Sequence, residues 1–140
     1  TISANVGKTR IRGAEFEGTW LPWTPLELRA TYSYNNAEFL DFLSDVCLAV
    51  LGTRQCAGQK LQNTPHQQGS FSAAFRQPVG DGWQWTTRAD LTWRSSMPMS
   101  EVNSARSPGF TLLNLRTGIE AGSWNLTAWL NNVTDEDSPA

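Results

Sequence analysis

The fold of this chain can be predicted from one stretch, Trp83-Gln84-Trp85-Thr86-Thr87-Arg88-Ala89-Asp90-Leu91-Thr92-Trp93-Arg94. Apolar residues and one threonine occupy every second position, and Gln, Thr, Arg and Asp lie between them. Successive side chains of a β-strand point to opposite faces of a sheet, so this period of two predicts a strand with one apolar and one polar face. The alternation also persists beyond the roughly five or six residues of an ordinary strand.

Five further segments share this alternation, three of them clearly and the first and last of the chain more weakly. They predict an all-β, antiparallel meander of about six long strands, each of roughly 9 to 12 residues, which is the length that crosses a bilayer at a tilt. No predicted apolar-face position carries a charge, which at the bilayer midplane would cost roughly 2 to 4 kcal/mol. The segments are residues 14–20, 26–35, 70–76, 113–120 and 124–131, with Trp129 on the polar side of the last.

The connections between these segments alternate in length. Residues 22–25, 78–82 and 121–123 are short and contain the Pro, Gly, Asp and Ser of tight turns, whereas 36–68 and 95–109 are long. Short turns at one end and long loops at the other are typical of a transmembrane β-barrel in a bacterial outer membrane.

Tryptophan is abundant, with seven residues, and its positions follow the turns. Trp93 and Tyr34 lie toward the opposite ends of their strands. Indole rings favour the water–lipid boundary, so both groups predict aromatic belts, although a soluble domain would instead bury them in a core. The tryptophans beside the short turns are Trp20, Trp23, Trp83, Trp85 and Trp124.

Charge and hydropathy argue against two classes of protein. The net charge of −2 argues against an electrostatic grip on nucleic acid, and no run approaches the roughly 20 apolar residues of a spanning helix. Cys47 and Cys56 lie close together in a loop-like stretch, which predicts a local disulfide in an oxidising compartment. The chain opens at Thr1 without a signal peptide, so we expect a fragment or a processed product.

Catalytic and cofactor chemistry is not expected. His66 is the single histidine, so neither a nucleophilic triad nor a Cys/His metal site can be assembled. The Gly80-Asp81-Gly82 turn precedes no helix that could hold a phosphate. The sequence therefore predicts neither an enzyme nor a metal or cofactor site.

Several motifs resemble the late barrel of TonB-dependent outer-membrane receptors, in matching order and over nearly the whole chain. The segment from Trp129 to Glu136 is similar to the one just before that family's final strand, as is 112–116. The late-strand motifs are Asn5-Val6-Gly7-Lys8, Gly13-Ala14-Glu15-Phe16-Glu17, 26–34 and Asn36-Ala37-Glu38-Phe39.

The resemblance implies a barrel of about 22 strands around an N-terminal plug, which imports a scarce nutrient with energy from TonB. The nutrient would be a ferric siderophore, cobalamin, haem or an oligosaccharide. Residues 1–140 would form a C-terminal part of that barrel in the outer membrane, without the plug or the last strand, since the chain stops at Ala140. Its partners would be membrane lipid, the plug and the nutrient, with TonB contacting only the plug.

Two sets of candidate site residues follow. Charged residues of the polar strand face would project into the lumen, where we expect cross-strand ion pairs, plug contacts or a wet path. Loop residues would contact ligand, and Phe39, Leu40, Leu43, Val46 and Val50 have the spacing of a short helix. The lumen set is Glu15, Glu17, Glu27, Arg29, Arg76, Arg88, Asp90, Arg94, Arg116 and Glu120, and the loop set is Phe39, Asp41, Asp45, Arg54, Glu101 and Arg106.

Two alternatives stay open at the level of sequence. A secreted soluble β-domain would bind carbohydrate or a protein partner through its tryptophans. It would pack Leu28, Tyr32, Leu91, Trp93 and Leu115 into a dry core. A porin or an autotransporter translocator would share the strands, although the long loops and the Asn131-Asn132-Val133-Thr134-Asp135-Glu136 segment argue against it.

Overall fold

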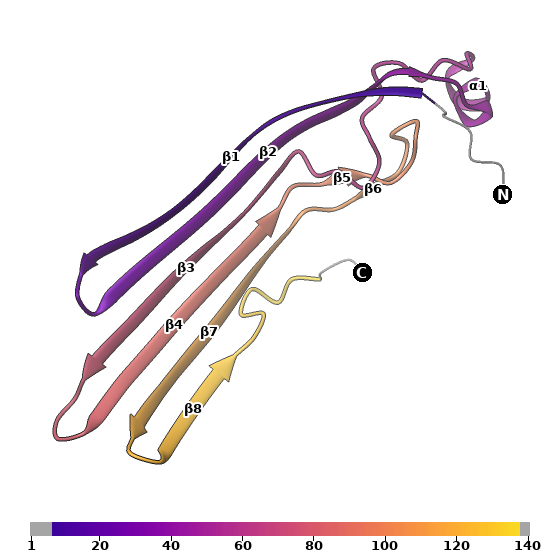
Figure 1. The fold of residues 1–140 in the computed structure, drawn as a ribbon. Helices are drawn as coiled ribbons and strands as arrows, with labels where there is room; N and C mark the ends of the chain where they lie inside the picture. The colour runs from indigo at the N-terminus through magenta and orange to yellow at the C-terminus, as the bar shows by residue number, and fades with distance from the viewer. Residues whose placement is uncertain (1–6, 138–140) are drawn as a thin grey trace.

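A single antiparallel sheet of six strands forms most of the chain in the computed structural model, which describes residues 7–137 (Figure 1). Each strand pairs with its neighbours in the order β1-β2-β3-β4-β7-β8, so the predicted meander is confirmed. The strands are β1 (Gly7–Trp23), β2 (Leu26–Phe42), β3 (Gln67–Pro78), β4 (Trp83–Arg94), β7 (Phe110–Ala121) and β8 (Trp124–Leu130).

The two ends of the sheet differ. At one end the strands join through three short turns, and Gly80, Gly82 and Gly122 in two of them have positive φ values, which glycine adopts without strain. At the other end lie α1 (Asp45–Leu51) and a small hairpin of β5 (Met97–Pro98) and β6 (Arg106–Ser107) (Figure 1). The predicted order of short and long connections is therefore present in the structure.

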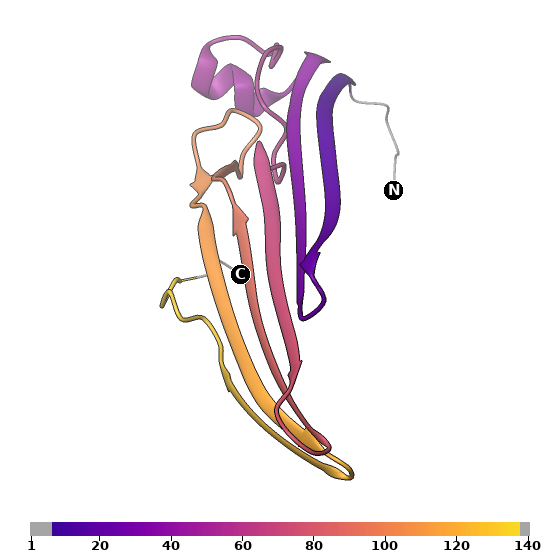
Figure 2. The same cartoon turned by 90° about the vertical axis from the view of Figure 1, so that its left-hand side faces the viewer.

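The register places the predicted apolar positions in common rows across the sheet. Ala30, Phe71, Leu91 and Leu113 lie opposite one another on four successive strands. The neighbouring polar row includes Thr31 and Ser70, whose hydroxyls are 2.7 Å apart. The alternation thus keeps one phase from strand to strand. Figure 2 shows the sheet turned by 90°, where its strands curve along their length.

β1 and β2 extend further than the alternation predicts. Each has 17 residues. β3 pairs with β2 only as far as Tyr34 opposite Gln67, whereas β1 continues along β2 to Phe42. Residues 7–13 and 35–42 therefore form a two-stranded extension beyond the six-stranded sheet, here called the outer ribbon. The predicted start of the loop at residue 36 was wrong, because residues 36–42 belong to β2.

The alternation changes sense on the outer ribbon, which explains the wrong boundary. Along β1, Arg10 and Arg12 fall on the same face as Phe16 and Trp20, because pairing with β2 is uninterrupted between Thr9 and Trp20. The apolar face that the sequence predicts therefore continues into a charged face on the ribbon.

The sheet is a single layer without a core of its own. Large apolar side chains on it are exposed, including Trp20 at 65% and Leu126 at 78%. Within residues 7–137 the buried hydrophobic residues are Ala37, Cys47, Cys56 and Val102, all at the loop end. No helix in this part of the chain is long and apolar enough to cross a bilayer.

Two sequence expectations lie wholly or partly outside the described residues. Asn5 and Val6 of the first receptor-like motif precede them, and so the structure describes only its Gly7 and Lys8. Residues 138–140, the end of the predicted C-terminal barrel segment, follow them.

Candidate functional site

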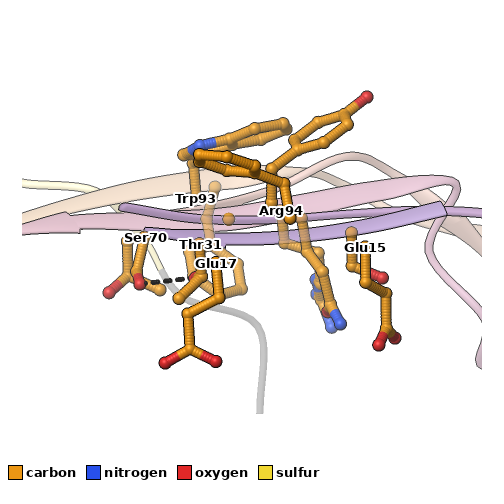
Figure 3. A pocket seen from close by; sticks show the side chains of 13 residues that line it. Glu15, Glu17, Thr31, Ser70, Trp93 and Arg94 are labelled. Atoms are coloured by element: carbon orange, nitrogen blue, oxygen red, sulfur yellow. Dashed lines mark hydrogen bonds between the residues drawn. The ribbon is translucent and has the colours of Figure 1, made fainter. Parts of the chain in front are cut away.

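The charged residues predicted for the lumen all fall on one face of the sheet. The register puts Glu15 in a row with Ser33, Gln68 and Arg94, and places Glu27 in a row with Ala74, Arg88 and Arg116. Figure 3 shows Glu15, Glu17 and Arg94 on one side of the strands and Trp93 on the other. The complete set on this face is Glu15, Glu17, Glu27, Arg29, Arg76, Arg88, Asp90, Arg94, Arg116 and Glu120.

Ion pairs on the polar face run along the strands. Arg29 pairs with Glu27 on β2, and the Arg88 guanidinium lies 2.7 Å from the Asp90 carboxylate on β4. Residues two apart on a strand share a face, so these contacts need no partner strand. The expected cross-strand ion pairs are not present on this face within residues 7–137. Both pairs are solvent-accessible, and such pairs contribute about 0 to 1 kcal/mol each.

A hollow on this face has an excess of arginine. Its volume is about 570 Å³, and its lining contains Arg29, Arg76, Arg88 and Arg116 but only two acidic residues, Glu27 and Glu120. Arg76 and Arg116 make no ion pair with any residue between 7 and 137. The hollow is therefore positively charged and keeps donors available for an anionic partner.

Arg94 closes the polar face at its loop end. Its guanidinium carbon lies 4.8 Å from the centre of the Phe110 ring, a cation–π arrangement. The same guanidinium donates a hydrogen bond to Ser107 Oγ at 3.3 Å. Arg94 thus joins the sheet to the second long loop.

Residues 43–66 and 95–109 fold together into a compact unit at the loop end, here called the loop lobe. A disulfide joins Cys47 on α1 to Cys56, and both cysteines are fully buried. Val102 from the second loop and Phe42 from the end of β2 pack against them. Within residues 7–137, the lobe is the part that has a hydrophobic core.

Hydrogen bonds hold the two loops of the lobe together. Asn103 accepts from the Lys60 backbone amide and donates to the Lys60 carbonyl, both at 2.9 Å. Ser44 donates to the Glu101 carboxylate at 2.6 Å. The Asn63 amide donates to the Pro98 carbonyl at 2.8 Å. The lobe is therefore one body rather than two independent loops.

The helix expected from residues 39–50 is shorter than its spacing suggests. α1 starts only after Ser44, whose side chain accepts from the Val46 amide as an N-cap, and it ends at Leu51, followed by Gly52 as the C-cap with a φ of 74°. Val46 and Val50 lie on the helix, but Phe39 and Leu40 lie on β2.

The loop ligand candidates are not gathered into one site. Asp45 and Arg54 form an ion pair on the first loop. Glu101 is engaged by Ser44, and Arg106 lies on β6, where it donates to Ser96. Their ligand contacts stay a prediction.

Phe39 and Asp41 were wrongly placed in a loop, since both lie on the outer ribbon. The Phe39 ring stacks on Phe42 with centroids 4.6 Å apart, and Asp41 accepts a hydrogen bond from Gln55 at 3.0 Å. Both side chains thus already have partners within the protein.

A charged cluster on the outer ribbon was missed at the level of sequence. Glu38 on β2 accepts from Arg10 on β1, and Lys60 from the loop lobe lies 3.6 Å from the same carboxylate. The hydrogen bond from Arg10 is the main cause that lowers the pKa of Glu38 below its ordinary value. Three cations at alternate positions, Lys8, Arg10 and Arg12, are the sequence signal that could have revealed it.

Aromatic side chains lie at both ends of the apolar face. Near the loop end, Tyr32 and Trp93 have ring centroids 6.0 Å apart, and Tyr34 and His66 are 5.3 Å apart. Near the turns the rings are exposed, and their amphipathic character suits a water–lipid boundary. The exposed tryptophans beside the turns are Trp20, Trp23, Trp83, Trp85 and Trp124.

A single-layer meander with one uncovered apolar face, one polar face and aromatic residues at both margins defines part of the wall of a transmembrane β-barrel. The family model for TonB-dependent receptor-like β-barrels matches residues 1–133. The chain belongs to this family, whose members are bacterial outer-membrane proteins.

A solved structure has a similar fold. The ferric yersiniabactin uptake receptor FyuA from Yersinia pestis matches with a TM-score of 0.75 and 17% sequence identity. The match covers 94% of this chain and 19% of that receptor, so the chain spans about a fifth of its structural relative.

Proposed function

We propose that residues 1–140 form a C-terminal part of the barrel of an outer-membrane active-transport receptor, which imports a scarce nutrient with energy supplied through TonB. A ferric siderophore is the proposed nutrient class, ahead of cobalamin, haem and oligosaccharides. The family match supports the receptor class, and the structural relative is a siderophore receptor by its name. Both are named as receptors rather than enzymes, so we propose no catalytic role.

One observation carries this proposal: the two faces of the sheet require different surroundings. Apolar rows such as Leu91 and Leu113 are uncovered by any element of residues 7–137, whereas the opposite face is rich in charges. A soluble β-domain would cover its apolar rows with a second layer. Lipid outside and a wet lumen inside would satisfy both faces, which supports placing the charged hollow in the lumen.

The lumen face would contact the plug of the same receptor. Its hollow contains more arginines than acids, so it suits an acidic segment of the plug or an anionic nutrient on its path. TonB would act on the plug and not on this segment. The loop lobe would contribute Asp45, Arg54 and Glu101 to nutrient binding outside the cell.

Uptake by the complete receptor tests the proposal. The parent protein would be expressed in a strain that lacks its own siderophore receptors, and the strain offered labelled ferric siderophores, haem and cobalamin. We expect saturable uptake of one ligand that stops when the proton-motive force is removed or TonB is absent. Uptake of none, or uptake that continues without TonB, would contradict the proposal.

A further inference from the structure

Trp129 is the one tryptophan on the polar face of the sheet. It lies opposite Arg116 on β7, whereas the other six tryptophans lie on the apolar face. The residue is 67% exposed. A tryptophan contributes most where another apolar or aromatic group covers its ring, and for this reason it is enriched at binding sites. The position of this indole therefore indicates contact with another molecule.

No aromatic or cationic side chain between residues 7 and 137 covers the Trp129 ring. The aromatic ring pairs of this part of the chain do not include it. Phe110 on the same face is covered by the Arg94 guanidinium, and Trp129 has no such contact. Side chains stand roughly perpendicular to a sheet, so another strand that paired with the edge of β8 would leave the ring uncovered from above. The indole is therefore available to a molecule in the space beside the polar face.

Trp129 lies at the rim of the arginine-rich hollow. Arg116 and Thr127 line this hollow, and Trp129 is directly opposite Arg116 and two residues beyond Thr127. Directly opposite residues have Cβ atoms about 4.5 to 5.5 Å apart, so the indole and the guanidinium can contact the same small molecule. Arg116 has no ion pair within residues 7–137, whereas the neighbouring Arg88 pairs with Asp90. The Trp129–Arg116 pair thus joins an open aromatic surface to an available cation.

We propose that the Trp129–Arg116 pair binds a planar aromatic ring that carries an anionic oxygen, as an aryl carboxylate or a phenolate does. The ring stacks on the indole with centroids about 4.5 to 7 Å apart, and the guanidinium donates to the anion. The hollow of about 570 Å³ falls within the roughly 300 to 1,000 Å³ of small-molecule sites, and its excess of arginine selects an anion. The inference rests on the proposed function and deepens it, because it makes an aromatic anion the part of the nutrient that the lumen wall recognises.

Binding of three small probes by the purified full-length receptor tests this site. Benzoate has both the ring and the charge, cyclohexanecarboxylate has the charge without the aromatic ring, and benzamide has the ring without the charge. Their dissociation constants would be measured by ligand-observed NMR. We expect benzoate to bind about tenfold more tightly than either of the other two probes.

Four variants of the receptor locate the binding. Trp129→Leu should reduce the affinity for benzoate to that for cyclohexanecarboxylate, and Arg116→Gln should reduce it to that for benzamide. Trp124→Leu and Arg12→Gln are the matched controls, because they remove an indole and a guanidinium from the opposite face. Both controls should bind benzoate like the wild type.

Three results would overturn the site. The first is equal affinity of the wild type for the three probes. The second is a folded, heat-modifiable Trp129→Leu receptor that binds benzoate like the wild type. The third is a wild-type receptor that inserts into the outer membrane but does not bind benzoate, which would leave the plug as the group that covers Trp129.

Uptake separates this inference from the proposed function. If benzoate binds as expected but the receptor imports no nutrient, the site stands and the transport proposal fails. If the receptor imports only a nutrient without aromatic groups, the transport proposal stands and this inference fails.

Discussion

The sheet and the loop lobe are stabilised in opposite ways. The lobe has a disulfide, a buried Val102 and hydrogen bonds that join its two loops. The sheet has continuous strand pairing, but its apolar rows stay uncovered, with Leu126 at 78% exposure. The lobe resembles a small extracellular domain, which covers its own core. The sheet requires lipid as its second layer.

This difference shows that two regions of one chain can suit different surroundings, water for the loop lobe and lipid for the sheet. In the proposed membrane placement, the apolar side chains of the sheet face lipid and the polar ones face the lumen. On the outer ribbon the face that is apolar elsewhere carries Arg10 and Arg12, and Ala37 is buried at 3% exposure. The ribbon is therefore the junction at which the pattern changes.

The largest expected effect comes from placing a charge on the lipid side of the sheet. In the full-length receptor, Leu91→Arg and Leu115→Arg should each cost roughly 2 to 4 kcal/mol near the bilayer midplane. Outer-membrane fractionation and heat-modifiable migration measure the loss of assembled barrel. Thr92→Arg is the matched control, because Thr92 lies next to Leu91 on the opposite face and we expect normal assembly. Equal failure of all three variants would show that the assigned faces do not matter.

The alternation made most of the sheet predictable. The strands and their two faces could be predicted from segments such as 83–94, because a hydrophobic period of two is the pattern of a β-strand with one apolar face. The short and long connections between these segments then predicted the order of the strands. The outer ribbon was not predicted, because Arg10, Arg12 and Glu38 occupy positions on the face that is apolar along the rest of the sheet. The apolar pattern therefore ends at the ribbon, although β1 and β2 continue.

The loop lobe was less predictable than the sheet. The short spacing of Cys47 and Cys56 indicated their disulfide, but no local pattern could show that Asn103 binds Lys60, because the contact joins two separate loops. The loop ligand set likewise came from residue type alone. The structure reassigns Phe39 and Asp41 to β2 and shows that Ser44 engages Glu101.

Removing the disulfide should affect the lobe and leave the sheet intact. For a loop closed over a separation of 9 residues, Cys47→Ser/Cys56→Ser should destabilise the lobe by about 2 to 3 kcal/mol. Limited proteolysis of intact cells should then cleave within residues 43–66, while the barrel keeps its heat-modifiable migration. Loss of the barrel itself would contradict the separation of the two regions.

A smaller effect should arise where the two loops of the lobe meet. Asn103 has a φ of 55° and three side-chain hydrogen bonds to Lys60 and Ser100. Asn103→Gly removes those bonds and relieves the backbone, whereas Asn103→Ala removes them and adds a left-handed strain of about 1 kcal/mol. Protease susceptibility of the lobe should rise in the order wild type, Gly, Ala. Equal susceptibility of the Gly and Ala variants would show that the backbone conformation is not held there.

The side-chain environment along β4 can be measured in the assembled barrel. Nitroxide labels would be placed one at a time at residues 89 to 94 of the full-length receptor in bilayers, and their accessibility to oxygen and to a water-soluble nickel chelate would be measured. We expect positions 89, 91 and 93 to be accessible to oxygen from lipid, and positions 90, 92 and 94 to the aqueous chelate. An opposite phase, or six labels with the same environment, would contradict a sheet that separates lipid from a wet lumen.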